Sequence, residues 1–209
     1  MIKILIAQKI LTDTATFIDQ VNSLPFGNAE KQRLLNINNV NTSRASLSAY
    51  LALSRLLENS SDNLTISRNA NGKPFFEHHK EIPFSISHSG ELSATAICYD
   101  YDNNIQSIGI DIEFKKGNIK FKDITNRFFR NEKASIQSED DFLILWTKKE
   151  AFSKMRGGAL TDVLTQTPQI TECYKIKFND KTAYMSVCCE IKQEIEILTD
   201  SNKISIIKT

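Results

Sequence analysis

The chain has 209 residues, of which 41% are hydrophobic and 24% are charged, and its formal net charge is +1. This composition is typical of a folded globular protein; it excludes a disordered chain and a global basic field directed at nucleic acid or an anionic membrane. No apolar run approaches the roughly 20 residues of a membrane-spanning helix, and the start of the chain lacks the layout of a signal peptide. The cysteines show neither CxxC pairs nor histidine partners at metal-ligand spacing, so we expect reduced core thiols in a cytoplasmic protein. They are Cys98, Cys173, Cys188 and Cys189.

Apolar and β-branched runs predict strands in both halves of the chain. Those of the first half are expected at residues 2–7, 64–68, 84–87, 93–99 and 107–114. After a helical middle, strands return at residues 174–178, 183–190, 194–198 and 203–208.

Two long helices are expected between these strands. The first is predicted from about Arg44 to Leu57, with a choice of N-cap residues before it. These are Asn41, Thr42 and Ser43. The second opens at Ser138, which has capping-box spacing with Asp141, and runs to about Met155 before RGGAL and TQTPQ end it.

This order of elements predicts an α/β (α+β) protein with two similar-sized lobes. We place the N-terminal lobe at residues 1–103 and the C-terminal lobe at 104–209, with the polar stretch 100–104 as the boundary and the active site in the cleft between them. No residue-by-residue repeat relates the two halves, so a duplication is inferred from layout alone.

The stretch SIGIDIEF, residues 107–114, holds two acids in an apolar frame. Asp111 and Glu113 are two residues apart, so they point to the same face of a strand. Burying two like charges costs several kcal/mol or forces one of them to bind a proton. We therefore expect a cation between them, either a Lys or Arg side chain or a metal ion.

The segment WTKKEAFSK places Trp146, Glu150 and Lys154 on one stripe of a helix. A surface ion pair between Glu150 and Lys154 is the simplest interpretation. The only tryptophan of the chain lies on the same stripe, which indicates a covered face and favours a cleft. Glu150 then joins Asp111 and Glu113, and three carboxylates without Cys or His favour magnesium over zinc or copper.

Two further segments carry polar side chains. In FSISHSG, a core or turn histidine is the simple interpretation of His88. A hydrolase triad of Ser87 or Ser89 with His88 and Asp111 is disfavoured, because the chain lacks a GxSxG elbow and neighbours on a strand point to opposite faces. A phosphate site fits better. Lys73, in the turn NGKPF, is either a second phosphate ligand or a solvated turn lysine.

In order and spacing, GKPFF, FSISHSG, IGIDIE and WTKKEAFSK resemble the signature segments of the 4′-phosphopantetheinyl transferases, in the longer, surfactin-synthetase-activating (Sfp-like) type. The resemblance directly covers about residues 71–160. It implies two similar α/β lobes with pseudo-twofold symmetry and coenzyme A bound in the cleft between them. It also implies an enzyme of the holo-[acyl-carrier-protein] synthase type, which transfers the 4′-phosphopantetheine arm from coenzyme A to a serine of an apo acyl or peptidyl carrier protein. Such an enzyme requires Mg²⁺ and releases 3′,5′-ADP, and we expect a monomer without nucleic-acid or membrane partners.

Carried over residue by residue, the resemblance implies that Asp111 and Glu113 bind magnesium. Glu150 would complete the metal site or act as the base on the carrier serine, and Lys154 would meet the transferred phosphate. The implied catalytic residues are thus Glu150, Lys154 and His88. The residues implied to hold coenzyme A are Arg44, Lys73, Ser87, His88 and Lys154.

The chain also departs from the family pattern. Ala159 stands where a second glycine is usual, Glu132 comes one residue early and is left out of the site, and the register of Lys31 and Arg33 is open. Two other functions are weighed against the transferase: a Ser/His/Asp hydrolase and a non-catalytic module that binds coenzyme A or a nucleotide. The carrier and its pathway, the tolerance of acyl-coenzyme A, and the choice between Glu150 and a metal-bound water as base stay open.

Overall fold

The computed structural model describes residues 1–57, 64–99, 105, 107–117, 120–129, 131–166 and 170–209. Its strands are β1 (Ile2–Gln8), β2 (Ile66–Arg68), β3 (Pro74–Phe76), β4 (Phe84–Ser89), β5 (Leu92–Cys98), β6 (Ile108–Phe114), β7 (Thr171–Phe178), β8 (Lys181–Cys189), β9 (Ile195–Thr199) and β10 (Ile204–Lys208). Its α-helices are α1 (Thr14–Ser23), α2 (Asn28–Leu35), α3 (Val40–Leu56), α4 (Phe121–Phe128) and α5 (Glu139–Arg156), with short 3-10 turns at Lys133–Ser135 and Leu160–Asp162. The expected mixed α/β class is confirmed.

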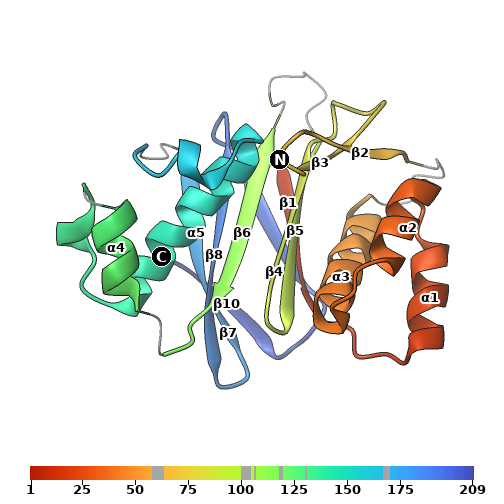
Figure 1. The fold of residues 1–209 in the computed structure, drawn as a ribbon, viewed down its shortest axis with the longest axis horizontal. Coiled ribbons are helices and arrows are strands. Elements are labelled where there is room, and N and C mark those ends of the chain that lie inside the picture. The colour runs from red at the N-terminus through yellow and green to blue at the C-terminus, as the bar shows by residue number, and fades with distance from the viewer. Residues whose placement is uncertain (58–63, 100–104, 106, 118–119, 130, 167–169) are drawn as a thin grey trace.

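The strands form two four-stranded sheets and one two-stranded ribbon. The first sheet has the order β4-β5-β1-β9, the second has the order β10-β7-β8-β6, and β2 pairs with β3. All neighbours are antiparallel except β1 and β9, which are parallel. Figure 1 shows α1, α2 and α3 on one side of the sheets and α4 and α5 on the other.

The hydrophobic core of the described residues consists of three clusters, and the side chains of a strand alternate between two of them. On β1, Ile4 points into a cluster shared by both sheets, whereas Leu5 points into the cluster that α3 covers. A third cluster, which includes Phe129 and Phe142, lies under α4 and α5. Because side chains of a strand alternate between two faces, each sheet can bury one face against the other sheet and one against helices. The result is a helix–sheet–sheet–helix order of layers.

Strands β4 and β6 lie side by side where the two sheets meet, but serine side chains replace the usual backbone ladder. The hydroxyls of Ser85, Ser87 and Ser89 accept hydrogen bonds from the backbone N–H groups of the facing strand. These donors are Ile110, Ile112 and Phe114, at 3.1, 3.4 and 3.2 Å respectively. The sequence pattern S-x-S-x-S therefore forms a seam between the sheets.

The longest predicted strands and the second helix are confirmed, but several short elements were missed. The first long helix begins at Val40 rather than near Arg44, because Asn39 caps it by accepting from the Thr42 N–H at 3.0 Å. Val40 is 56% exposed, so the first turn lacks the apolar periodicity that marks the rest of the helix. The helices α1, α2 and α4 and the strand β3 were not predicted.

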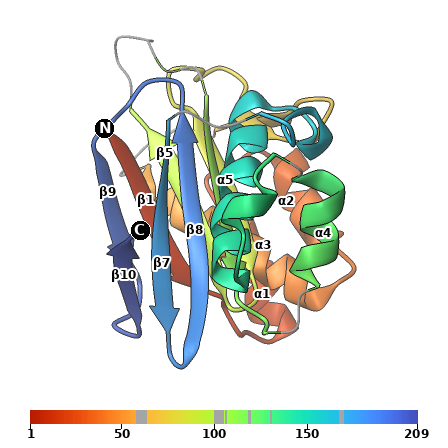
Figure 2. The ribbon, with the colours of Figure 1, turned by 90° about the vertical axis from the view of Figure 1, so that its left-hand side faces the viewer.

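The lobe assignment stays a prediction. The proposed boundary stretch 100–104 lies outside the described residues, as do residues 167–169 of the predicted break TQTPQ. Strand β9 comes from the second half of the chain but pairs with β1 of the first sheet, and Figure 2 shows β9 and β10 on the side away from the helices. All four cysteines are free and buried, as expected. Among the helices that the structure describes, none combines the length and the apolar character needed to cross a membrane.

Candidate active site

A cavity of about 510 Å³ is lined by residues of α2, α3, β2, β4, β6 and α5. Six of the eight residues singled out in the sequence contribute to this lining. They are Ser87, His88, Asp111, Glu113, Glu150 and Lys154. Residues that are far apart in the sequence, from Arg33 to Lys154, are thus brought together at the seam between the two sheets.

Asp111 is the most buried acid of the cavity, with 4% of its surface exposed. Its Oδ1 atom accepts a hydrogen bond from the Ser87 hydroxyl at 2.8 Å and an ion-pair hydrogen bond from Lys154 Nζ at 2.8 Å. Lys154 Nζ also donates to the Ser87 hydroxyl at 2.9 Å. The cation expected beside the two strand acids is therefore the Lys154 ammonium in this structure.

The other acids of the cavity are held without a lysine of their own. Glu113 accepts a hydrogen bond from the Ser89 hydroxyl at 2.9 Å. Burial raises the pKa of Glu113, and the charge of Asp111 raises it further, against the smaller opposite effect of Ser89. Burial and the charge of Asp111 likewise raise the pKa of Glu150. The three acids Asp111, Glu113 and Glu150 thus share a single lysine, Lys154, among the residues that line the cavity.

In the described part of the chain, Ser87, His88 and Asp111 do not form the hydrogen-bonded triad of a hydrolase. The Ser87 hydroxyl donates to Asp111, and within the described residues no hydrogen bond joins the His88 imidazole to either of them. Desolvation by the cavity wall, followed by the charge of Lys154, lowers the pKa of His88. The lowered pKa favours the neutral imidazole, which can donate one hydrogen bond and accept another.

The helix α5 that carries Glu150 and Lys154 is fixed at both ends. Ser138 is its N-cap and forms the predicted capping box with Asp141. Gly157 ends the helix in the left-handed conformation, with a φ of 65°. Between the ends, α5 rests directly on β6, because Gly109 offers no side chain: a Cβ atom there would lie 1.9 Å from the Ala151 carbonyl oxygen. This close approach determines how far Glu150 and Lys154 reach over the strand acids.

Two arginines form a cationic wall of the cavity: Arg33 of α2, which the sequence left as an open candidate, and Arg68 of β2, which it did not predict. Glu30 is 4% exposed and accepts hydrogen bonds from Arg33 at 2.7 Å and Arg68 at 2.8 Å. Arg68 also donates to the Tyr50 hydroxyl at 2.8 Å. Both arginines line the cavity. Of the two basic residues whose register was open, Arg33 therefore reaches the site, whereas Lys31 donates to the backbone carbonyl of Asn22.

Arg44 and Lys73 lie outside the lining of this cavity. The Arg44 guanidinium donates to the Thr12 carbonyl of the loop before α1. Lys73 Nζ donates to the Ser107 hydroxyl and to the carbonyls of Ile108 and Met155, at 3.1 and 3.2 Å. Burial lowers the pKa of Lys73 to about 8. Their proposed contacts with coenzyme A stay predictions.

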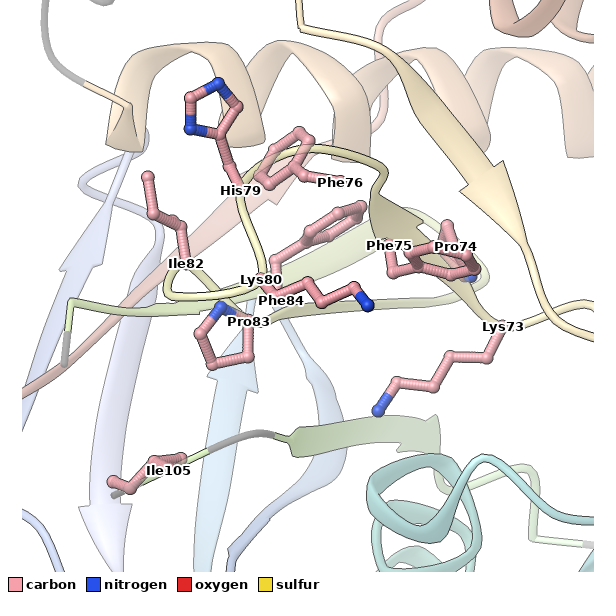
Figure 3. Close-up of a pocket in the computed structure, with 10 residues that line it drawn as sticks. All are labelled: Lys73, Pro74, Phe75, Phe76, His79, Lys80, Ile82, Pro83, Phe84 and Ile105. Carbon is pink, nitrogen blue, oxygen red and sulfur yellow. The ribbon is translucent and has the colours of Figure 1, made fainter. Parts of the chain in front are cut away.

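Lys73 lines a second pocket, of about 360 Å³, together with residues around β3 and the start of β4. Figure 3 shows the aromatic and proline side chains of this pocket, with Ile105 at its edge. It contains no carboxylate among its lining residues. The three acids, together with Lys154 and His88, are in the larger cavity, which we therefore take as the candidate active site.

Glu132, which was left out of the predicted site, has a structural partner. It accepts an ion-pair hydrogen bond at 2.6 Å from Lys149, whose side chain is completely buried. Lys149 Nζ also donates to the carbonyls of Leu164 and Gln166, at 2.8 and 2.5 Å. This cluster fixes the segment that follows α5 and does not line the cavity.

The residues of the cavity fit a hard divalent cation in their chemistry, although they do not form a ready ligand set. In the described part of the chain, no group of three or more His, Cys, Asp or Glu side chains is arranged to hold a metal ion. However, Asp111 Oδ2 is buried and lacks a hydrogen-bond partner among the described residues, and such an atom requires a donor or a cation. The carboxylate oxygens of Asp111, Glu113 and Glu150, which line the same cavity, are ligands of the type that magnesium prefers.

Comparison with known proteins relates the second half of the chain to one family. Residues 107–203 match the model of the family described as the 4′-phosphopantetheinyl transferase superfamily. A "4′-phosphopantetheinyl transferase" of Bacillus subtilis is 37% identical over 98 residues, which cover 43% of this chain and 40% of the relative. The "4′-phosphopantetheinyl transferase AcpT" of Salmonella typhi is 29% identical over 101 residues, which cover 45% of this chain and 50% of the relative. The matches thus span half or less of these relatives.

Proposed function

We propose that the chain transfers the 4′-phosphopantetheine arm of coenzyme A to a serine of an apo acyl or peptidyl carrier protein, because residues 107–203 match the model of the 4′-phosphopantetheinyl transferase superfamily. The observation that carries the proposal is the meeting of Asp111, Glu113, Glu150 and Lys154 in one cavity beside two arginines. Acids and cations at such short range suit a reaction in which charge moves between phosphate oxygens.

The reaction breaks one bond of the coenzyme A pyrophosphate and forms one bond to the carrier. The serine oxygen attacks the phosphorus of the phosphopantetheine arm, and the bond from that phosphorus to the bridging oxygen breaks. The leaving group is 3′,5′-ADP, and the serine proton must pass to a base. Phosphoryl transfer needs positioning and charge neutralisation more than covalent catalysis.

Glu150 is our candidate for the base. A general base works best when its pKa approaches the working pH, and both burial and Asp111 raise the pKa of Glu150. Lys154 faces it from the same helix and is our candidate for the cation that meets the transferred phosphate. To do so, its ammonium would be shared between Asp111 and the substrate.

Asp111, Glu113 and Glu150 would hold a magnesium ion, which would supply charge neutralisation at the pyrophosphate. The unpaired Asp111 Oδ2 atom supports this assignment, as does the excess of acids over lysines in the cavity. A cation near Asp111 would also compensate the repulsion that raises the pKa of Glu113 and Glu150.

The arginine wall would hold the other phosphates of coenzyme A. Arg68 and Arg33 are kept in place by the buried Glu30 carboxylate and face the same cavity as His88. Guanidinium groups bind phosphate through paired N–H donors. We include the predicted ligands Arg44, Lys73 and Ser87 in the proposal, and Lys73 would have to exchange a carbonyl partner for a phosphate oxygen.

The finer features of the proposal are those of the resemblance. We propose the Sfp-like type, with holo-[acyl-carrier-protein] synthase activity, acting as a cytoplasmic monomer with coenzyme A and a carrier protein as partners. Two lobes, 1–103 and 104–209, would hold the active site in the cleft between them.

Mass spectrometry provides the direct test. The protein is incubated with coenzyme A, magnesium and apo carriers from fatty-acid, polyketide and nonribosomal-peptide systems, and one phosphopantetheine arm should be added to an acceptor serine. Excess chelator should stop the reaction and added magnesium should restore it. Asp111→Ala should abolish most transfer, with Asp19→Ala on the exposed face of α1 as the matched control.

Three results would contradict the proposal. Binding of coenzyme A without modification of any carrier would favour the non-catalytic module. Transfer by Asp111→Ala at the rate of the unchanged protein would remove the role of the carboxylates. Labelling by a serine-directed inhibitor, with indifference to chelators, would instead favour the hydrolase.

A further inference from the structure

The turn between β2 and β3, residues 69–73, is bound to the C-terminal end of α5. The side-chain amides of Asn69 and Asn71 both donate to the Gly157 carbonyl, at 2.8 and 2.9 Å. Lys73 Nζ donates to the Met155 carbonyl at 3.2 Å, and Figure 3 shows its side chain directed toward the start of β6. The last carbonyls of a helix have no partner within the helix. Here the carbonyls of Met155 and Gly157 accept hydrogen bonds from residues more than 80 positions earlier in the chain, and the Met155 carbonyl also accepts one from the Ser107 hydroxyl.

Asn69 is the central residue of this connection. Its Oδ1 atom accepts the backbone N–H groups of Asn71 at 3.0 Å and Lys73 at 2.9 Å, which fixes the shape of the turn. Its Nδ2 atom reaches the helix end at Gly157. One side chain therefore shapes the turn and joins it to α5.

The same turn is braced on its other side by the cationic wall of the cavity. Arg68 Nη1 donates to the Gly72 carbonyl at 2.7 Å, while Arg68 Nη2 binds Glu30 and Tyr50. Arg68 lines the cavity from β2, and Lys154 lines it from α5. Residues 69–73 thus connect two walls of one cavity through short hydrogen bonds.

We propose that Asn69 is a positioning residue. The turn of residues 69–73, which we call the clasp, holds the end of α5 and thereby sets the spacing between the Arg68 wall and the Lys154 wall. For its effect on catalysis, this inference rests on the proposed transferase function. In phosphoryl transfer the two walls must contact different parts of one substrate, so a change in their spacing reduces the rate even when each residue is intact.

The test compares Asn69→Asp with a control in the same turn. Asn69→Asp keeps an oxygen that accepts the two turn N–H groups but places a second oxygen, in place of a donor, against the Gly157 carbonyl. Gly72→Ala strains the turn because Gly72 has a φ of +83°, yet its new methyl group meets no atom within 4 Å. The control therefore weakens the turn without removing a bond to α5.

The position of α5 is measured first, by methods that do not depend on activity. Amide NMR signals of Glu150 and Lys154 should shift in Asn69→Asp, and hydrogen exchange at Gly157 and Gly158 should accelerate, because both amides close the last turn of α5. Gly72→Ala should leave these signals in place. Signals that coincide with those of the unchanged protein in Asn69→Asp, or that move equally in both variants, would overturn the clasp.

Transfer is measured second. In Asn69→Asp, kcat should fall about tenfold or more while the KM for coenzyme A changes less than about threefold, since misplacement of about 1 Å can cost that much. Gly72→Ala should keep kcat within about twofold. Shifted signals with an unchanged kcat would overturn the positioning role. If the unchanged protein modifies no carrier, the proposed function fails, and the NMR and exchange measurements still decide whether the clasp holds α5.

Discussion

The contact between Gly109 and α5 can be tested by adding one methyl group. In Gly109→Ala the new Cβ atom would lie 1.9 Å from the Ala151 carbonyl oxygen and 2.5 Å from the Met155 backbone nitrogen. A carbon–oxygen contact normally needs about 3.3 Å, so α5 must retreat by more than about 1 Å. Both opposing atoms belong to the helix backbone, so no side-chain rotation can relieve the clash.

We expect two effects from this retreat. Overpacking a tight contact typically costs about 1–3 kcal/mol of the free energy of unfolding, and a backbone clash should reach at least the upper end. Glu150 and Lys154 would move with the helix, and a displacement of about 1 Å can reduce the transfer rate about 100-fold. Urea unfolding and the carrier mass assay measure the two effects separately.

A glycine without such a contact serves as the control. At Gly27 a Cβ atom would meet no atom closer than 3.8 Å, and its φ of −57° is ordinary for alanine. Gly27→Ala should therefore leave stability and transfer nearly unchanged. If Gly109→Ala behaved like Gly27→Ala in both assays, the argument that α5 is held by this close approach would be refuted.

Local signals in the sequence predicted α5 well. Ser138 and Asp141 have the spacing of a capping box, and both residues act within one turn of the chain, so the start of the helix does not depend on distant contacts. The glycines after Arg156 predicted its end for the same reason. By contrast, α2 has a mostly polar sequence and no side-chain cap, and Glu30 and Leu34 are its only buried residues. Its position depends on partners elsewhere, which periodicity does not report.

The acids and lysine of the candidate site were found because they lie in dense motifs, whereas Arg33 was only one of two open candidates and Arg68 was missed. Arg68 gains its role from Glu30, which is 38 residues away in the chain, and no local pattern predicts that pairing. A polar residue at the end of a strand, just before a glycine turn, was the only available signal. Lys73 illustrates the converse: its motif is plain, but its ammonium group contacts backbone carbonyls of β6 and α5 that only the fold brings near.

Three further substitutions test the N-cap of α5, the buried ion pair between Lys149 and Glu132, and the raised pKa of Glu150. Ser138→Ala removes the N-cap of α5 and should lower the free energy of unfolding by about 1 kcal/mol. It should not affect transfer, because Glu150 lies about three helical turns away. Thermal melts measure the first effect and the mass assay measures the second. Lys149→Met leaves the Glu132 carboxylate and two carbonyls without their donor, so it should cost about 3–5 kcal/mol, and a double variant with Glu132→Gln should recover part of this in urea unfolding. Glu150→Gln should stabilise the metal-free protein near neutral pH, because burial and Asp111 raise the pKa of Glu150 in the folded chain above its ordinary 4.5. Between 4.5 and the raised value the folded chain binds more protons than the unfolded one, so the unchanged protein loses stability as pH rises through that window. The glutamine variant lacks this loss, and its advantage should therefore disappear when urea unfolding is repeated in chelator below pH 4.5. An advantage that is the same at every pH would show that the repulsion between Glu150 and Asp111 is not its cause.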